Sequence, residues 1–218
     1  MKNTSRLFTL FFALFTLILL SACGTEPPDP LAEISASVAG GTAPDFIALN
    51  DLDPDIIAWL CIPGTDINRP VYRTDQGVHI DPANGSVSAE APAILLLGSS
   101  EGADAPFRSL QHTYSVDSSL RDASAVLLYT PDGLQSWRVF GAGAFRDIDI
   151  LSIYDSFRNP RNIPWFAEQW QKHHTMIRIL DPAASVTEDD RLLILSTELN
   201  QTPGQRFLVL ALSVDTAG

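Results

Sequence analysis

The chain has 218 residues, of which 26 are Asp or Glu and 14 are Lys or Arg, and its formal net charge is −12 at pH 7. Phosphate backbones and anionic lipid headgroups attract basic surfaces, so this acidic balance argues against nucleic acid as a partner. The 45% of hydrophobic residues suffice for one globular domain of ordinary size, and the sequence has no internal repeat.

Residues 1–22 have the features of a secretory signal. Lys2 and Arg6 precede an apolar run over residues 7–20, and small residues follow it. The ending "LSAC" resembles the bacterial lipobox, which implies cleavage before Cys23 and attachment of a diacylglyceryl group to its sulfur. An ordinary signal peptide with an incidental cysteine is the alternative.

A lipid on Cys23 would determine where the protein acts. Several acyl chains hold a protein at a bilayer far better than one chain does. We therefore expect a secreted protein anchored through Cys23 to the outer face of a bacterial membrane. Cys61 would then have no partner within the chain, so the sequence predicts no intramolecular disulfide framework.

Residues 24–45 are rich in Pro, Gly, Ala and Ser and have almost no large apolar side chains. Such a segment cannot bury enough surface to offset the entropy lost on ordering. The sequence therefore predicts a lipidated cysteine and flexible tether over residues 23–45, followed by one domain over residues 46–218.

The predicted domain is mostly β. Phe46, Leu49 and Leu52 share one face of a short helix, which ends before Asp53-Pro54. Apolar, β-prone runs separated by Gly- and Pro-containing turns then indicate strands. The predicted strands are 56–62, 70–73, 93–97, 125–129, 137–145, 176–180, 192–197 and 205–214.

One helical insertion interrupts the strands before the last ones. From about residue 163 the spacing of Trp165, Phe166 and Trp170 is helical, and Pro164 suits a first helical turn. Many short strands with one helical insertion predict a closed or nearly closed β-barrel.

Three stretches resemble class B sortases. They are "LNDLDPDIIAWLCIPGTDINRPVYR" at 49–73, "ILLLGSSEGADAPFRSL" at 94–110 and "LLILSTELN" at 192–200. Gly98, Phe107 and Leu110 fall where the family has them, and the helical insertion is placed as in class B members. The resemblance covers nearly the whole domain and implies a sortase-like closed β-barrel.

The resemblance implies a cell-surface transpeptidase that uses three residues. In sortases a Cys thiolate attacks the sorting-signal peptide, a His protonates the leaving amine, and an Arg stabilises the substrate and oxyanion. The His position holds Ser99 and the Cys position holds Glu198, while Arg206 keeps the Arg position. Serine does not titrate near neutrality, and a carboxylate is a poor nucleophile toward an amide, so we predict an inactive sortase-like lipoprotein.

Glu198 and Arg206 are expected to lie on neighbouring strands and to form a buried, charge-assisted pair. The rival interpretation is a hydrolase in which Ser99 is the nucleophile and Glu198 its base. A carboxylate near its normal pKa barely activates a hydroxyl, and the cation of Arg206 would lower the basicity of Glu198 further.

No other residue group offers a convincing catalytic or metal site. His112 follows the family loop but is expected to be exposed, and His79 stands alone. The adjacent His173 and His174 point in different directions on a helix, which makes a poor metal clamp. Cys61 is expected to be a buried, inert thiol. Asp53, Asp55, Asp75 and Asp81 match no calcium loop, and no cofactor motif is present.

Three functions remain open at this point. The first is a non-enzymatic binding or accessory module that recognises a sorting-signal peptide, a cell-wall fragment or a partner sortase. The second is a divergent sortase-family transpeptidase or hydrolase of surface-protein sorting signals. The third is a purely structural remnant, and fold-level analogy does not decide among them.

Overall fold

The computed structural model describes residues 29–84, 86–102, 105–115, 124–173, 177–199 and 202–214. The chain divides into two compact units, residues 1–33 and 34–218. The predicted signal segment and Cys23 lie outside the described residues. Within the described ranges, no helix combines the length and the hydrophobicity that crossing a membrane requires.

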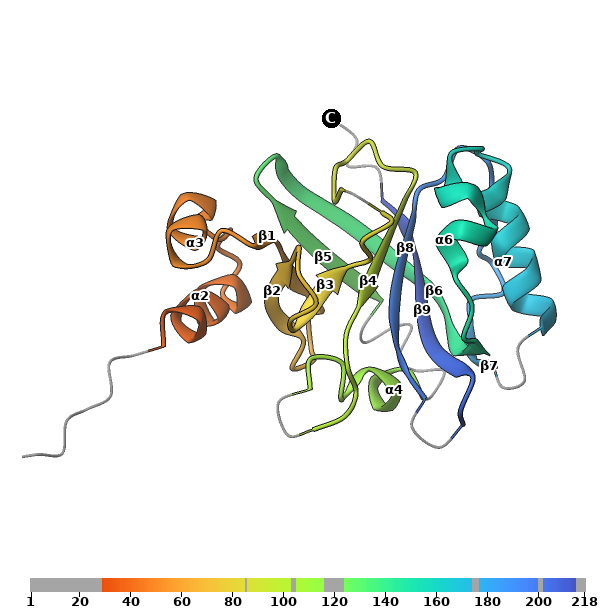
Figure 1. The fold of residues 1–218 in the computed structure, drawn as a ribbon, viewed down its shortest axis with the longest axis horizontal. Coiled ribbons are helices and arrows are strands. Elements are labelled where there is room, and N and C mark those ends of the chain that lie inside the picture. The colour runs from red at the N-terminus through yellow and green to blue at the C-terminus, as the bar shows by residue number, and fades with distance from the viewer. Residues whose placement is uncertain are drawn as a thin grey trace, which may run out of the picture. The chain divides into compact units, whose positions relative to one another are not determined.

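Nine strands of the described chain form one sheet in the second unit. The strand order is β5-β1-β2-β3-β4-β8-β9-β6-β7, and β5 also pairs with β6. That extra pairing closes eight strands into a barrel, with β7 on the edge of β6 (Figure 1). The predicted mainly β fold with a closed barrel is confirmed. The strands are β1 (Ile56–Cys61), β2 (Asn68–Tyr72), β3 (Val78–Ile80), β4 (Ala93–Leu97), β5 (Ala125–Thr130), β6 (Gly133–Arg146), β7 (Ile177–Leu180), β8 (Leu192–Glu198) and β9 (Gln205–Ser213).

Two predicted helical regions are present. The short N-terminal helix is α3 (Phe46–Leu52), where the Asp45 side chain accepts hydrogen bonds from the first-turn amides and Leu49 is buried. The insertion before the last strands contains α6 (Ile150–Ile153), the single turn η1 (Asp155–Phe157) and α7 (Asn162–His173). A further short helix, α4 (Leu110–Thr113), follows the loop after β4.

Strand β8 is buried on both faces, which explains its unbroken apolar sequence. Leu193 and Leu195 pack in the barrel interior, whereas Leu192 and Ile194 pack on the outer face beneath the helical insertion. It pairs in parallel with β4 on one side and antiparallel with β9 on the other. A central strand of this kind holds the residues at its end in a fixed position.

The helical insertion packs tightly on the barrel. Figure 1 shows α6 and α7 beside β8, β9 and β6, and the buried Phe166 and Trp170 of α7 belong to the same apolar cluster as Leu208. A Cβ atom on Gly141 of β6 would lie 2.8 Å from the Trp170 ring, so only glycine permits this approach. The insertion is therefore held firmly against the outer face of the barrel.

The segment predicted to be a flexible tether differs from that expectation, because residues 30–39 form helix α2 (Pro30–Ala39). Asp29 accepts a hydrogen bond from the Leu31 amide at its start. Within the second unit, Val38 is buried, the Asn68 side-chain amide donates to the Ser35 carbonyl at 2.7 Å, and the Ser35 hydroxyl donates to the Asn68 carbonyl. The amino-acid composition of the segment could not predict this docking, because it depends on one buried apolar side chain and two hydrogen bonds.

Candidate functional site

The end of β8 presents two polar side chains on the outer face of the strand. Ser196 and Glu198 are two residues apart, so they point to the same side. Ser196 is only 1% exposed, whereas the Glu198 side chain is 51% exposed. The difference follows from the neighbouring strand, because β4 ends with Leu97 opposite Ser196 and no longer flanks Glu198.

Arg206 contacts both of these residues from β9. It lies on the neighbouring strand, as predicted, and is the direct cross-strand partner of Glu198. Its Nε donates to the Ser196 hydroxyl at 2.6 Å, while its Nη1 lies 3.7 Å from Glu198 Oε1. The stronger contact of the guanidinium is therefore with Ser196, which the sequence did not identify as a site residue. The two-residue spacing from Glu198 was the signal that could have found it.

The expectation of a buried, charge-assisted Glu198–Arg206 pair is wrong in two respects. The ion pair forms, but 3.7 Å exceeds a hydrogen-bond distance and the carboxylate is half exposed. Solvated pairs of this kind contribute about 0–1 kcal/mol to stability. Arg206 itself is better shielded, with 18% of its side chain exposed.

Ser99 lies in the loop after β4 and takes part in local contacts. Its hydroxyl accepts a hydrogen bond from the Glu101 amide at 3.1 Å, and its carbonyl accepts one from the Phe107 amide. Among the hydrogen bonds of the described residues, none joins the side chains of Ser99 and Glu198. The contact that a serine nucleophile and a glutamate base would need is thus not formed.

The backbone at Glu198 is fixed by two side chains from this loop region. Its carbonyl accepts hydrogen bonds from the Ser100 hydroxyl at 3.1 Å and from the Gln111 side-chain amide at 3.0 Å. The Gly98 amide donates to the Ser196 carbonyl two residues earlier. The loop after β4, helix α4 and the end of β8 therefore form one connected unit.

An open pocket lies on the outer face beside Arg206. Its volume is about 370 Å³, and Glu198 and Ser99 are not among its lining residues. Its floor comes from β4, β8 and β9, and its rim comes from the loops after β3 and β6. Three aspartates face one arginine there, so the lining is net acidic. The lining residues are Asp81, Ala83, Leu95, Leu97, Asp147, Ile148, Asp149, Ile150, Ser196 and Arg206.

The architecture is similar to that of solved sortase structures. A sortase B from the type II pilus of Streptococcus pneumoniae superposes with a TM-score of 0.65 at 18% identity, over 79% of this chain and 100% of that chain. A sortase B complexed with triglycine gives 0.64 at 21% identity, over 79% and 86% of the two chains. A Staphylococcus aureus sortase B–substrate complex gives 0.64 at 20% identity, over 79% and 85%.

The chain has the class B sortase fold. No protein-family model matches it, and no curated protein matches it. At this level of identity the likeness establishes the fold, whereas activity and substrates have to be argued from the site itself.

The sequence landmarks of the sortase resemblance have a clear structural role here. A Cβ atom on Gly98 would lie 2.7 Å from the Phe107 ring, and both Phe107 and Leu110 are fully buried. Glycine at residue 98 therefore allows the loop after β4 to fold back over the strand end. The same fold-back places Ser100 and Gln111 against Glu198.

The remaining candidate residues lie away from this arrangement or lack catalytic partners. His112 on α4 is exposed, and His79 on β3 is partly exposed. The side chain of His173 and the whole of His174 lie outside the described part of the chain. Cys61 is a free, buried thiol on β1, and burial raises its pKa, which suits an inert side chain. Among the residues that the structure describes, no three His, Cys, Asp or Glu side chains converge to hold a metal ion.

Proposed function

We propose that this protein is a sortase-like binding module that does not catalyse transpeptidation. The observation that carries the proposal is the arrangement at the end of β8. At the position that the sequence resemblance assigns to the nucleophilic cysteine stands Glu198, 3.7 Å from Arg206. A carboxylate there supplies no thiolate, and loss of the nucleophile from a triad-type site costs about a millionfold in rate.

The neighbouring residues support the same conclusion. Ser99 stands at the position assigned to the general acid, and its hydroxyl is engaged by the Glu101 amide. A serine cannot exchange a proton near neutral pH as an imidazole does. We therefore infer that the end of β8 and the neighbouring loop keep the fold of a sortase and its arginine, without the two groups that perform the chemistry.

A peptide or cell-wall fragment is the ligand class that the pocket beside Arg206 fits best. Two solved proteins of this fold are described as a substrate complex and as a complex with triglycine. In the present chain the pocket beside Arg206 has a volume of about 370 Å³, within the range typical of ligand sites. A ligand can occupy it without meeting a nucleophile.

The charges of the pocket set a preference among peptides. Asp81, Asp147 and Asp149 outnumber Arg206, whose guanidinium is already held by Ser196. Clefts lined by one sign of charge concentrate ligands of the opposite sign. We therefore expect the pocket to favour peptide segments that carry an amino group over segments rich in carboxylates.

The test separates binding from turnover in one experiment. The purified domain is titrated with fluorescently labelled sorting-signal and wall peptides of positive, neutral and negative charge, and each mixture is examined by mass spectrometry. Saturable binding without new products, strongest for the positive peptides, is the expected result. Cleaved or transferred peptide would show a divergent transpeptidase or hydrolase instead.

A matched pair of variants locates the binding. Asp147→Asn removes one carboxylate of the pocket rim and should weaken binding of the positive peptide. Asp155→Asn removes an exposed carboxylate that pairs with Arg158 on the helical insertion, and it should leave binding unchanged. Equal effects of the two substitutions would point to a general effect of charge, and the cleft would then not be the binding site.

We also propose that the module is secreted and anchored through a lipid on Cys23 to the outer face of a bacterial membrane. The support is the lipobox-like ending of the first 22 residues. Mass spectrometry of the membrane fraction should detect a diacylglyceryl adduct on an N-terminal Cys23. Replacing Cys23 by Ser should release the protein from that fraction, and a chain that stays membrane-bound without the cysteine would contradict the anchor.

A further inference from the structure

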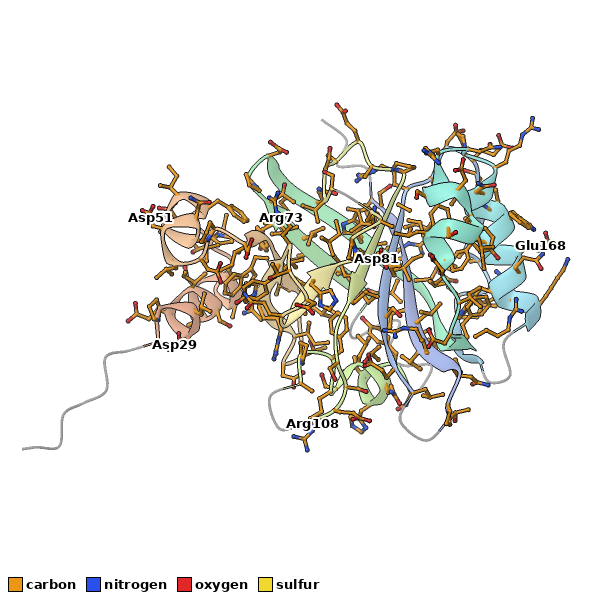
Figure 2. The ribbon with its side chains drawn as sticks, in the orientation of Figure 1. Asp29, Asp51, Arg73, Asp81, Arg108 and Glu168 are labelled. Atoms are coloured by element: carbon orange, nitrogen blue, oxygen red, sulfur yellow. The ribbon has the colours of Figure 1, made fainter. Side chains whose placement is uncertain are left out.

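A second pocket, separate from the pocket beside Arg206, lies between α3, the strands β1 and β3, and the hairpin turn that joins β5 to β6. Its volume is about 310 Å³, and it shares no lining residue with the pocket beside Arg206. In Figure 2 the labelled Arg73 lies between α3 and this hairpin turn, away from Asp81 of the first pocket. The lining residues are Asn50, Pro54, Ile56, Ile57, Arg73, Ile80, Ser86, Val87, Ser88, Thr130, Pro131 and Asp132.

The floor of this pocket is aliphatic. Ile80 and Val87 belong to the apolar cluster that fills the barrel, and Ile57 packs against that cluster. Ile56 adds a further buried side chain from the start of β1. The pocket therefore ends on the barrel core, where a branched aliphatic group would be removed from water.

Two opposite charges lie at its rim. Arg73 follows β2, and Asp132 is in the β5–β6 turn. Among the described residues, neither side chain forms an ion pair or a hydrogen bond, although five other arginines, at 138, 158, 161, 191 and 206, have carboxylate, carbonyl or amide oxygens as partners. An unpaired guanidinium is the side chain best suited to hold a carboxylate through two parallel hydrogen bonds.

We propose that this pocket binds a small zwitterion with an aliphatic side chain, namely a free amino acid or a dipeptide. Arg73 takes the ligand carboxylate, Asp132 takes its ammonium group, and the aliphatic side chain lies on Ile56, Ile80 and Val87. A volume near the lower limit of typical ligand pockets, about 300 Å³, fits one or two residues better than a long peptide.

The presence of both charges determines the ligand class. A simple carboxylic acid would satisfy Arg73 but bring its negative group near Asp132. An amine would satisfy Asp132 but leave the guanidinium without a partner. Only a ligand with both groups complements both side chains, and specificity of this kind rests on the penalty for the mismatched alternatives.

The experiment uses leucyl-leucine as the probe, with calorimetric titration of the whole mature chain. N-acetyl-leucyl-leucine lacks the ammonium group, leucyl-leucine amide lacks the carboxylate, and glycyl-glycine lacks the aliphatic side chains. Saturable binding of leucyl-leucine is expected, with each analogue at least about tenfold weaker, because each loses a charged contact or the apolar floor. Absence of saturable leucyl-leucine binding would overturn the proposal.

Two rim variants assign each charge to its partner. Arg73→Gln should weaken the binding of leucyl-leucine about tenfold. It should not weaken the binding of leucyl-leucine amide, because this ligand has no carboxylate for Arg73 to hold. Asp132→Asn should likewise weaken the binding of leucyl-leucine but not that of N-acetyl-leucyl-leucine, which has no ammonium group for Asp132 to hold. If the affinity loss from a variant and the loss from its matching analogue simply add, the substituted side chain and the missing ligand group do not contact each other.

Control variants remove equivalent charges elsewhere. Arg158→Gln and Asp75→Asn change exposed side chains outside this pocket, and both should keep the native affinity. Losses as large as those of the rim variants would indicate a long-range charge effect and reject the site. The cleft beside Arg206 does not enter this test, so its outcome is independent of the proposed peptide binding.

Discussion

Glu198 and Arg206 are direct partners across β8 and β9, and the Glu198 carboxylate lies 3.7 Å from the guanidinium of Arg206. Strand register alone brings the two side chains together, and no hydrogen bond joins them. The guanidinium instead donates to Ser196, whose side chain is almost completely buried. The ion pair is therefore a product of the fold rather than a main source of its stability.

Replacing Glu198 by Ala should change the free energy of unfolding by less than about 1 kcal/mol, because the carboxylate is half exposed. Replacing Ser196 by Ala should cost more, about 1–3 kcal/mol, because the shielded Arg206 loses its closest acceptor. Urea unfolding of both variants measures the difference. A Glu198→Ala cost as large as that of Ser196→Ala would show that the ion pair matters more than its geometry suggests.

A cysteine at residue 198 would test the electrostatic setting of this position directly. In a chain with Cys23 replaced by Ser, Glu198→Cys should give a thiol whose pKa lies below its ordinary value, because the cation of Arg206 favours the thiolate. Ultraviolet titration of the thiolate measures this pKa, and adding Arg206→Gln should raise it again. The buried Cys61 provides an internal reference that reacts slowly with thiol reagents. Identical pKa values with and without Arg206 would contradict the proximity of the two groups.

The sequence predicted this strand pair but not its exposure. An apolar run ending in Ser-Thr-Glu was sufficient to place β8, and the resemblance to class B sortases implied that Glu198 and Arg206 lie on neighbouring strands. Whether Glu198 is covered depends on where β4 ends, since Leu97 lies opposite Ser196 and no strand residue follows beside Glu198. That is a tertiary property with no local signal.

Other parts of the fold had weaker signals still. Strand β3 has only three residues and pairs in parallel with β2, so neither alternation nor length could identify it. The acidic rim of the cleft joins Asp81 with Asp147 and Asp149, from loops that only the barrel brings together. By contrast, the other strands of the barrel and helix α7 had more regular patterns and are present, although β6 begins at Gly133, four residues before the predicted start, and β2 begins at Asn68, two residues before.

Gly98→Ala should destabilise the domain by about 1–3 kcal/mol, because the new methyl group would lie 2.7 Å from the buried Phe107 ring. The double variant Gly98→Ala with Phe107→Leu should recover part of this loss relative to the sum of the two single changes. Thermal and urea unfolding of the four proteins completes the cycle. Strict additivity would show that the close approach of these two residues does not constrain the loop.

The stability of the domain should fall in alkaline solution. Burial raises the pKa of the Cys61 thiol and of the Tyr114, Tyr129 and Tyr154 hydroxyls in the folded state. The unfolded chain then releases these protons at lower pH than the folded chain does. Stabilisation is therefore complete below the ordinary pKa values and is lost as the pH rises through and above them, from about pH 8.5 upward.

Tyr114 has the largest upward pKa shift of these groups, so Tyr114→Phe should reduce the steepness of the alkaline loss. The measurement is the slope of unfolding free energy against pH between neutral and strongly alkaline solution. Loss of the hydroxyl itself changes the free energy of unfolding by the same amount at every pH, and such a constant change does not affect this slope. A slope unchanged by the substitution would show that Tyr114 titrates alike in the folded and unfolded chains.

The docking of α2 should depend on Asn68. Its side chain accepts from the Trp59 indole at 2.6 Å and donates to the Ser35 carbonyl at 2.7 Å. Asn68→Ala should cost about 1–3 kcal/mol, since the buried indole loses its acceptor, and it should accelerate amide hydrogen exchange over residues 34–39. Ser35→Ala removes only the hydroxyl contact and should have the smaller effect on both measurements. Equal exchange rates in Asn68→Ala and the native chain would place the docking of α2 elsewhere.

Helix α2 also sets how far the domain could stand from a membrane. If residues 24–45 formed an extended chain, the domain could stand at most about 75 Å from a lipid on Cys23. Because Ser35 already contacts Asn68 within the second unit, only residues 24–34 would separate Cys23 from the domain, over at most about 37 Å. An anchored molecule of this design would sample a thin layer next to the bilayer.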